Sequence, residues 1–292
     1  VTTPEGLVWI GGNNNKEVSG QVFFVNWDGE KQQLHITKLP PLPMPLDNLS
    51  ATYADGCLYV AGGKGKPQTV PIGKDGSQTA PTNPLFSLQL TPSLQKEWVR
   101  LPDFPGPARV QPVLTAQQSE DGIRLYLAGG FQPASAHQEA IVCTDMLSYH
   151  PKTKQWRNEG FLPSLAGGSH RTVTGGCAIA SGDSSILLVG GVNYDRFRDA
   201  LNHPEPDYLL HPADWYKFNT SLLQYNTFTK HWTHLGNYEE LARAGAGIAN
   251  NANTVIIIGG ELKPGIRTPE VNAFKLIILS RKYSTTQNNN QE

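Results

Sequence analysis

The chain has 292 residues, with 24 Lys and Arg against 25 Asp and Glu, and a formal net charge of −1. This near-neutral charge gives no electrostatic reason to expect nucleic acid or an anionic membrane surface as a partner. The apolar runs are about five to eight residues long, which is too short to span a bilayer, so we expect no membrane insertion.

An apolar strand that ends in two glycines recurs along the chain. The copies are residues 7–12, 58–63, 125–130, 186–191 and 255–260. Successive second glycines, at positions 12, 63, 130, 191 and 260, are separated by 51, 67, 61 and 69 residues. Repeats of about 50 residues, each with an apolar strand closing on a glycine pair, indicate the blades of a propeller.

Other parts of the unit repeat as well. A strand of small and apolar residues precedes most copies, and a later strand carries a tyrosine seven residues before a tryptophan, as in Tyr149 to Trp156 and Tyr225 to Trp232. Such short sheets bury both faces only when they pack radially against neighbours. The pattern resembles the kelch repeat, so we predict an all-β propeller with five recognisable blade units. The tryptophans expected to pack between blades are Trp9, Trp98, Trp156 and Trp232.

The first and last units look incomplete. The first unit begins almost directly with its Gly-Gly strand. The last unit ends in residues 271–279, which contain no tryptophan. We expect residues 1–283 to form one propeller domain and residues 284–292 a polar C-terminal tail. Either strands from both termini share the closure of the ring, or a further blade precedes Val1.

Two long insertions interrupt the period. Residues 64–84 are rich in Gly, Pro, Lys and Thr and predict a surface loop. Residues 192–220 carry aromatic side chains among charges, and residues 195–201 and 212–218 are each expected to form a helical turn or two, the second with a proline at its start. This second insertion is expected to be a lid, a subunit contact, or a segment folded on its own side chains.

Polar residues recur where a propeller brings its loops together at one mouth of the central channel. They are Asn13, Asp47, Asn48, Arg109, Gln111, Ser169, His170, Arg171, Asn193, Arg243, Glu261 and Arg267. Arginine side chains bind carboxylates, and amide side chains form hydrogen bonds with hydroxyl groups. This set of residues therefore suits a small, anionic, hydroxyl-rich ligand. The residues expected to bind substrate are Asn48, Arg109, Gln111, Asn193 and Arg243.

Motifs of other enzyme classes are absent from the sequence. There is no GxSxG, HExxH, phosphate-binding GxxxxGK[ST] or dinucleotide fingerprint, and the eight histidines show no ligand spacing. Cys57, Cys143 and Cys177 lie far apart without a CxxC pair, and we interpret them as buried, reduced thiols. We expect no metal and no cofactor.

The segment around Glu261 carries a more specific resemblance. Residues 260–268, Gly-Glu-Leu-Lys-Pro-Gly-Ile-Arg-Thr, together with residues 190–193 and the end of the aromatic insertion, resemble the N-acetylneuraminate epimerase (sialic acid mutarotase) family of kelch proteins. The order of the blades differs from that of well-known members, which suggests a circularly permuted relative. That family has six blades and five are visible here, so one blade is expected upstream of Val1.

The resemblance implies an isomerase that interconverts the α and β anomers of N-acetylneuraminate. It assigns Glu261 as the acid/base and Arg267 as its cationic partner, with a sugar acid as substrate, and it suggests a periplasmic or secreted bacterial setting. We also expect a homodimer. Two alternatives remain open. One is a non-catalytic kelch propeller that binds a glycan or a partner protein through residues 192–220, and the other is a copper oxidase of the kelch type.

Overall fold

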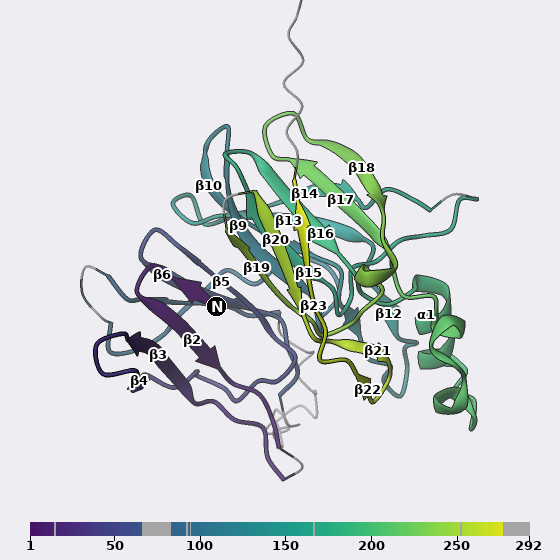
Figure 1. Ribbon diagram of the computed structural model, residues 1–292, viewed down its shortest axis with the longest axis horizontal. Helices are drawn as coiled ribbons and strands as arrows, with labels where there is room; N and C mark the ends of the chain where they lie inside the picture. Colours follow the sequence, from purple (N-terminus) through teal and green to yellow (C-terminus); the bar gives the residue numbers. More distant parts are fainter. Residues whose placement is uncertain are drawn as a thin grey trace, which may run out of the picture.

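The computed structural model (Figure 1) describes residues 1–276, apart from residues 15, 66–82, 92, 94, 166 and 252. It confirms the predicted all-β propeller, because five antiparallel sheets follow one another along the chain as five blades. Most of the insertion 64–84 and the whole tail 284–292 lie outside the described residues. No helix in the described part of the chain is long and apolar enough to cross a membrane.

The first three blades each contain four strands in the described residues. Blade 1 consists of β1 (Thr2–Thr3), β2 (Gly6–Ile10), β3 (Val22–Asp28) and β4 (Gln33–Leu39). Blade 2 consists of β5 (Ser50–Ala54), β6 (Cys57–Ala61), β7 (Leu85–Gln89) and β8 (Val99–Leu101). Blade 3 consists of β9 (Val113–Ser119), β10 (Gly122–Ala128), β13 (Asp145–His150) and β14 (Gln155–Phe161), with a small side hairpin of β11 (Phe131–Gln132) and β12 (Ile141–Val142).

The last two blades carry the features that matter for function. Blade 4 consists of β15 (Cys177–Ser181), β16 (Ser185–Val189), β17 (Ser221–Asn226) and β18 (His231–Asn237). Blade 5 has three strands in the described residues, β19 (Gly247–Asn251), β20 (Thr254–Ile258) and β23 (Val271–Lys275). A separate hairpin, β21 (Glu261–Lys263) and β22 (Ile266–Arg267), projects between β20 and β23.

The hydrophobic core is divided among the interfaces between successive blades. One cluster joins blades 1 and 2 through residues such as Val8 and Val60, and another joins blades 4 and 5 through Leu187 and Val255. Two further clusters fill the interfaces of blade 3 with its neighbours. Within the described residues, blades 2, 3 and 4 therefore lend both faces to the core, and blades 1 and 5 lend one face each.

The repeated tyrosine and tryptophan lie opposite each other across the outer hairpins. Tyr149 pairs with Trp156 at a ring separation of 5.0 Å, and Tyr225 pairs with Trp232 at 4.8 Å. Both tyrosines are fully buried, so the prediction of packing between blades is confirmed for these units. Trp98 is buried too, against blade 1.

The prediction is wrong for Trp9, whose side chain is 71% exposed on the outer face of blade 1. That face carries further exposed apolar side chains from neighbouring strands, and blade 5 also has an uncovered apolar face. The exposed residues are Leu7, Trp9, Trp27, Leu34 and Ile36 on blade 1 and Ile258 and Val271 on blade 5. No hydrophobic cluster among the described residues joins blade 5 to blade 1, so these two faces lack the neighbour that the other blades have.

The Gly-Gly pairs end their strands where backbones meet most closely. Gly190 and Gly191 both have positive φ, and a Cβ on Gly190 would lie 2.6 Å from the carbonyl oxygen of Arg243 in the next blade. Only glycine accepts this conformation and this close approach together. The turns that follow the pairs are thereby held at one end of the propeller, where the candidate site lies.

The aromatic insertion is folded and sits at the same end as the β21–β22 hairpin (Figure 1). The predicted helical turns are confirmed as α1 (Tyr194–Asn202) and η2 (Ala213–Tyr216), the latter directly after Pro212. A further short turn, η1 (Tyr208–Leu210), lies between them, and η3 (Glu239–Leu241) leads into blade 5. Tyr216 and Phe218 form a small core of their own with Val192, so the insertion packs largely on itself.

Candidate active site

The β21–β22 hairpin brings Glu261 and Arg267 together. The chain reverses at Pro264 and Gly265, the glycine having a φ of 77°, and the two residues become partners across the hairpin. Arg267 Nε lies 3.5 Å from Glu261 Oε1. The separation of five residues in the sequence is therefore closed by the turn, as the predicted pairing of the two side chains requires.

The backbone of Glu261 is fixed while the side chains remain accessible. Reciprocal hydrogen bonds of 3.0 and 2.7 Å join Glu261 to Ala244, next to the inner strand of blade 5. The Glu261 side chain is 31% exposed and that of Arg267 is 82% exposed. An ion pair this open contributes little to stability, so both groups can engage a ligand at little structural cost.

Lys263 has a structural partner that the sequence did not indicate. Its Nζ donates hydrogen bonds to the carbonyl oxygens of Leu209 and His211 in the aromatic insertion, at 3.2 and 2.6 Å. These bonds tie the hairpin that carries Glu261 to the loop between α1 and η2. The insertion therefore supports the candidate site from outside.

A row of four left-handed residues links blades 2 to 5 at the end of the propeller where the Gly-Gly turns lie. They occupy equivalent positions before the inner strands and are Asn48, Gln111, Gly175 and Gly245, with φ between 50° and 69°. The last three donate their backbone N–H to the carbonyl of the residue before them in this row, at 2.8, 3.0 and 2.7 Å in turn. Asn48 and Gln111 also approach through their side chains, at 3.3 Å. Two of the predicted substrate-binding residues thus lie side by side at the mouth.

Arg109 and Arg243 do not face a ligand. The Arg109 side chain is completely buried, donates to the carbonyl of Gly129 and forms a two-pronged ion pair with Asp145 at 2.8 to 2.9 Å. Arg243 is 2% exposed in its side chain and is held in the same way by Gly259 and by Glu270, at 2.7 Å. Both guanidinium groups fasten a Gly-Gly turn to the third strand of a blade, so the structure gives them a structural role instead of the predicted contact with substrate.

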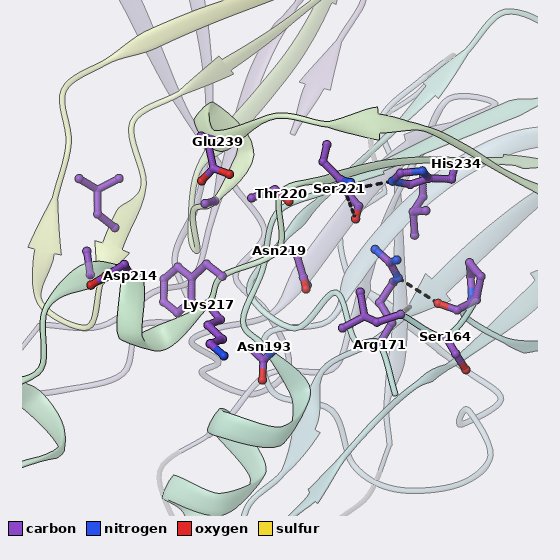
Figure 2. Close-up of a pocket in the computed structure, with 18 of the residues that line it drawn as sticks. Ser164, Arg171, Asn193, Asp214, Lys217, Asn219, Thr220, Ser221, His234 and Glu239 are labelled. Atoms are coloured by element: carbon purple, nitrogen blue, oxygen red, sulfur yellow. Dashed lines mark hydrogen bonds between the residues drawn. The ribbon is translucent and has the colours of Figure 1, made fainter. Parts of the chain in front are cut away.

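Asn193 begins helix α1. Its side-chain oxygen accepts a hydrogen bond from the backbone N–H of Arg196 at 3.0 Å, which is the capping role that asparagine performs well. Asn193 also lines a cavity of about 1070 Å³ beside blade 4, shown in Figure 2 and called the lateral cavity below. Its walls come from the connection between β14 and β15, from the insertion, from β17 and β18, from Glu239 and Ala242 at η3, and from Leu262 on the β21–β22 hairpin.

The titratable groups offer few other candidates for chemistry. Burial raises the pKa of the Cys143 thiol to about 11 and that of Cys177 to about 12, which confirms both as inert, protonated thiols. Cys57 is only partly buried. Within the described residues, one group has metal-ligand geometry, in which atoms of Glu205, Asp207 and His211 lie within 4.8 Å of one another on the insertion.

Comparison with known protein families shows which family this chain belongs to. The model of the family described as N-acetylneuraminate epimerase matches residues 39–289, most of the chain. The chain belongs to the N-acetylneuraminate epimerase family. The matched range includes both Glu261 and Arg267.

Individual relatives in this family are distant and longer. The N-acetylneuraminate epimerase of Salmonella paratyphi B is 27% identical over 248 residues, which cover 80% of this chain and 57% of that protein. The one from Pasteurella multocida is 27% identical over 215 residues, covering 69% of this chain and 52% of that protein. The chain thus spans little more than half the length of the curated relatives that it matches.

A solved structure supports the fold. The structure of YjhT, a kelch-type propeller, matches with a TM-score of 0.63 at 24% sequence identity, over 83% of this chain and 68% of that one. At this identity the likeness bears on the architecture alone. The order of blades implied by a circular permutation stays a prediction.

Sequence reasoning missed the partners of the buried arginines, although a signal was present. In blades 3 and 5 an arginine stands four residues before the inner strand, and an acid stands at or just before the start of the third strand. The acids are Asp145 and Glu270. An arginine and an acid at matched positions of two repeats indicate a repeated ion pair, which is a stronger interpretation than two independent ligand contacts.

Proposed function

We propose that this chain interconverts the α and β anomers of N-acetylneuraminate. The observation that carries the proposal is the Glu261–Arg267 pair, held at 3.5 Å on a hairpin whose backbone is fixed, in a chain of this family. A carboxylate beside a guanidinium, both reachable from solvent, provides the proton acceptor and the carboxylate-binding group that the reaction requires.

The chemistry is a proton transfer coupled to opening of the ring. Glu261 accepts the proton of the anomeric hydroxyl as the bond between C2 and the ring oxygen breaks, and the ring oxygen takes a proton from water. Rotation about the C2–C3 bond of the open 2-keto acid presents the other face of the carbonyl. The ring oxygen then attacks C2, returns its proton to water, and Glu261 gives its proton back to the new anomeric hydroxyl.

Arg267 orients this reaction. Its guanidinium fits the planar C1 carboxylate of the sugar acid in two parallel hydrogen bonds, and it lies 3.5 Å from the carboxylate of Glu261, so both groups can contact the same substrate. General acid–base assistance of this kind supplies rate factors of about 10²–10⁴, which suffices for a reaction that also occurs unaided in water.

The other proposed contacts come from the mouth of the channel. We propose that the amides of Asn48 and Gln111 bind hydroxyl groups of the sugar; both residues have a left-handed backbone, and a backbone hydrogen bond joins them. A periplasmic or secreted setting, which rests on the resemblance to the family, and a homodimer also belong to the proposal.

Anomer exchange followed by NMR tests the proposal. A sialidase releases the α anomer of N-acetylneuraminate, and the decay of its signal is recorded with and without this protein. We expect the protein to shorten the decay at catalytic concentration. An unchanged decay, together with measurable binding of the sugar, would support the non-catalytic propeller instead.

A further inference from the structure

The lateral cavity is lined by a buried cation that has no counterion among the described residues. Arg171 is 7% exposed, and its Nε donates to the carbonyl oxygen of Pro163 at 2.9 Å. In contrast to Arg109 and Arg243, it forms no ion pair with any acid in the described part of the chain. Arg171 lines the cavity, and its terminal nitrogens donate no hydrogen bond within the described residues.

The reason for the difference lies in blade 4 itself. In blades 3 and 5 the first glycine of the pair accepts a hydrogen bond from an arginine that is neutralised by an acid. In blade 4 the amide of Asn219 takes that place and donates to the carbonyls of Gly190, Thr172 and Val192. The turn is therefore held without a charge, and Arg171 is left for another purpose.

A second cation lines the same cavity, on a different element of the chain. Lys217 follows η2 and has a left-handed backbone with φ of 49°, and it forms no ion pair within the described ranges. Figure 2 shows its side chain extending toward Asn193, away from Glu239. The neighbouring Tyr216 is buried and bonded to the carbonyl of Tyr208, so the strained position of Lys217 is held by the core of the insertion.

The other lining residues indicate what kind of ligand the cavity accepts. Because all its hydrogens are directed to backbone carbonyls, Asn219 leaves its oxygen toward the cavity (Figure 2). Hydroxyl groups from Ser164 and Thr220 alternate with apolar surface from Leu165 and Phe218. Carboxylates are present as well, from Asp214 and Glu239, which disfavours a ligand with several negative charges.

We infer that the lateral cavity binds a sugar bearing a single carboxylate, which Arg171 and Lys217 hold while the amide and hydroxyl groups contact the sugar hydroxyls. The volume of about 1070 Å³ exceeds what one monosaccharide needs, so the ligand is either the free sugar acid or the acidic end of a short glycan. Glu261 and Arg267 do not line the cavity, although Leu262 of the same hairpin does, so the two sites adjoin each other. The experiment below removes the Glu261–Arg267 pair, and its result therefore does not depend on the proposed function.

Calorimetric titration tests this inference in a background where Glu261→Gln and Arg267→Gln remove the other binding pair. The probes are N-acetylneuraminate, its uncharged methyl ester, and α-2,3-sialyllactose. We expect the acid to bind and the ester to bind at least about tenfold more weakly, because the ester loses its charge-assisted hydrogen bonds. Tighter binding of the trisaccharide would identify a glycan end as the ligand, and equal or weaker binding the free acid.

Variants locate the binding. Lys217→Asn suits a left-handed backbone and is expected to weaken the acid about tenfold, as is Arg171→Gln. Lys154→Asn is the matched control, since Lys154 is also exposed and left-handed, with φ of 57°, on a hairpin of blade 3, and it should leave the affinity unchanged.

The inference is overturned if the acid does not bind in this background, or if Lys217→Asn binds as tightly as Lys154→Asn. Thermal unfolding of each variant shows whether it is folded. If Arg171→Gln is not folded, the affinity of Lys217→Asn alone decides the inference. If the wild-type chain does not accelerate anomer exchange but the acid binds to the cavity in the double-variant background, the proposed function is refuted and the inference stands. If the wild type accelerates exchange but the acid does not bind in that background, only the inference is refuted.

Discussion

At the scale of single residues, arginine serves three purposes in this chain. Arg109 and Arg243 are buried and neutralised, Arg267 is exposed beside Glu261, and Arg171 is buried without an acid in the described residues. A guanidinium buried with a carboxylate holds two pieces of backbone together, whereas one that opens into a cavity is available to a ligand.

The Arg109–Asp145 pair makes a prediction about stability. Asp145→Ala leaves a fully buried guanidinium without its counterion and should lower the free energy of unfolding by about 3 kcal/mol. Asp103→Ala is the control, because its pair with Arg100 at 2.9 Å is exposed and should cost less than about 1 kcal/mol. Urea denaturation measures both, and equal losses would contradict the structural role of Arg109.

Asp121 predicts a dependence of stability on pH. Its hydrogen bonds from Arg124 hold the pKa of the carboxyl well below its usual range. Because the folded pKa lies below the unfolded value of about 4, the carboxylate stabilises the fold above about pH 4 and ceases to do so as pH falls through the folded pKa. The carboxylate is 46% exposed, so the contribution is a modest one.

The measurement compares the wild type with Asp121→Asn by chemical denaturation from pH 6 to about pH 2. We expect the wild type to be the more stable of the two near neutrality and the difference to shrink as the pH falls. A difference that stays constant over this range would mean that the Arg124 contact does not depend on the charge of Asp121.

The sequence predicted which residues lie at the mouth better than it predicted what they do there. Position in the repeat placed Asn48, Gln111 and Glu261 correctly, because every blade places the same loop at the same end of the propeller. It could not tell Arg109 from Arg267, since the difference is whether an acid that is distant in sequence reaches the guanidinium. That depends on packing between strands and not on the local sequence.

At the scale of elements, the Gly-Gly turns decide how closely the blades approach. Gly190→Ala adds a Cβ 2.6 Å from the oxygen of Arg243 and 3.0 Å from that of Leu241, at a φ of 67°. Gly182→Ala adds a Cβ at a φ of 57° with nothing within 4 Å. The two substitutions thus share the left-handed backbone and differ only in the clash.

Both substitutions should lower the free energy of unfolding by about 1 kcal/mol, because alanine disfavours the left-handed conformation. Gly190→Ala should lower it by roughly a further 1–3 kcal/mol, because a backbone carbonyl must move. Thermal or urea unfolding of the two variants gives the comparison. If both lost the same free energy, close approach of backbones would not explain the glycine at position 190.

The elements themselves could mostly be predicted from the sequence. Apolar runs closing on Gly-Gly located the second strand of every blade, and Pro212 located η2. The β21–β22 hairpin could not be predicted in the same way, because strands of three and two residues are too short to show a periodicity.

At the scale of the whole molecule, the main feature is the pair of apolar faces on blades 1 and 5, which no neighbouring blade covers among the described residues. Side chains from three adjacent strands of blade 1 form one apolar surface, since Leu7, Val25 and Ile36 are register partners on it. Trp9 was predicted to be buried from its place in the repeat, and it is exposed because burial requires a neighbouring blade that the described residues do not supply.

This surface predicts self-association. Contiguous exposed apolar patches of this kind usually mark contact surfaces, so the chain should sediment as oligomers whose size grows with concentration. Leu34→Lys with Ile36→Lys should shift it toward the monomer, whereas Leu210→Lys, at an 80% exposed residue of the insertion, should not. A wild-type chain that stays monomeric at every concentration in analytical ultracentrifugation would contradict this.

The account rests most heavily on Glu261 as the proton acceptor. The most direct measurement is two-dimensional exchange NMR of N-acetylneuraminate at anomeric equilibrium, with the wild type, with Glu261→Gln and with Glu120→Gln, whose carboxylate forms a comparably exposed pair with Lys230 at 3.8 Å. We predict that the wild type and Glu120→Gln raise the exchange rate equally and that Glu261→Gln loses the acceleration by about 10²-fold or more. An exchange rate for Glu261→Gln equal to that of the wild type would contradict the central claim.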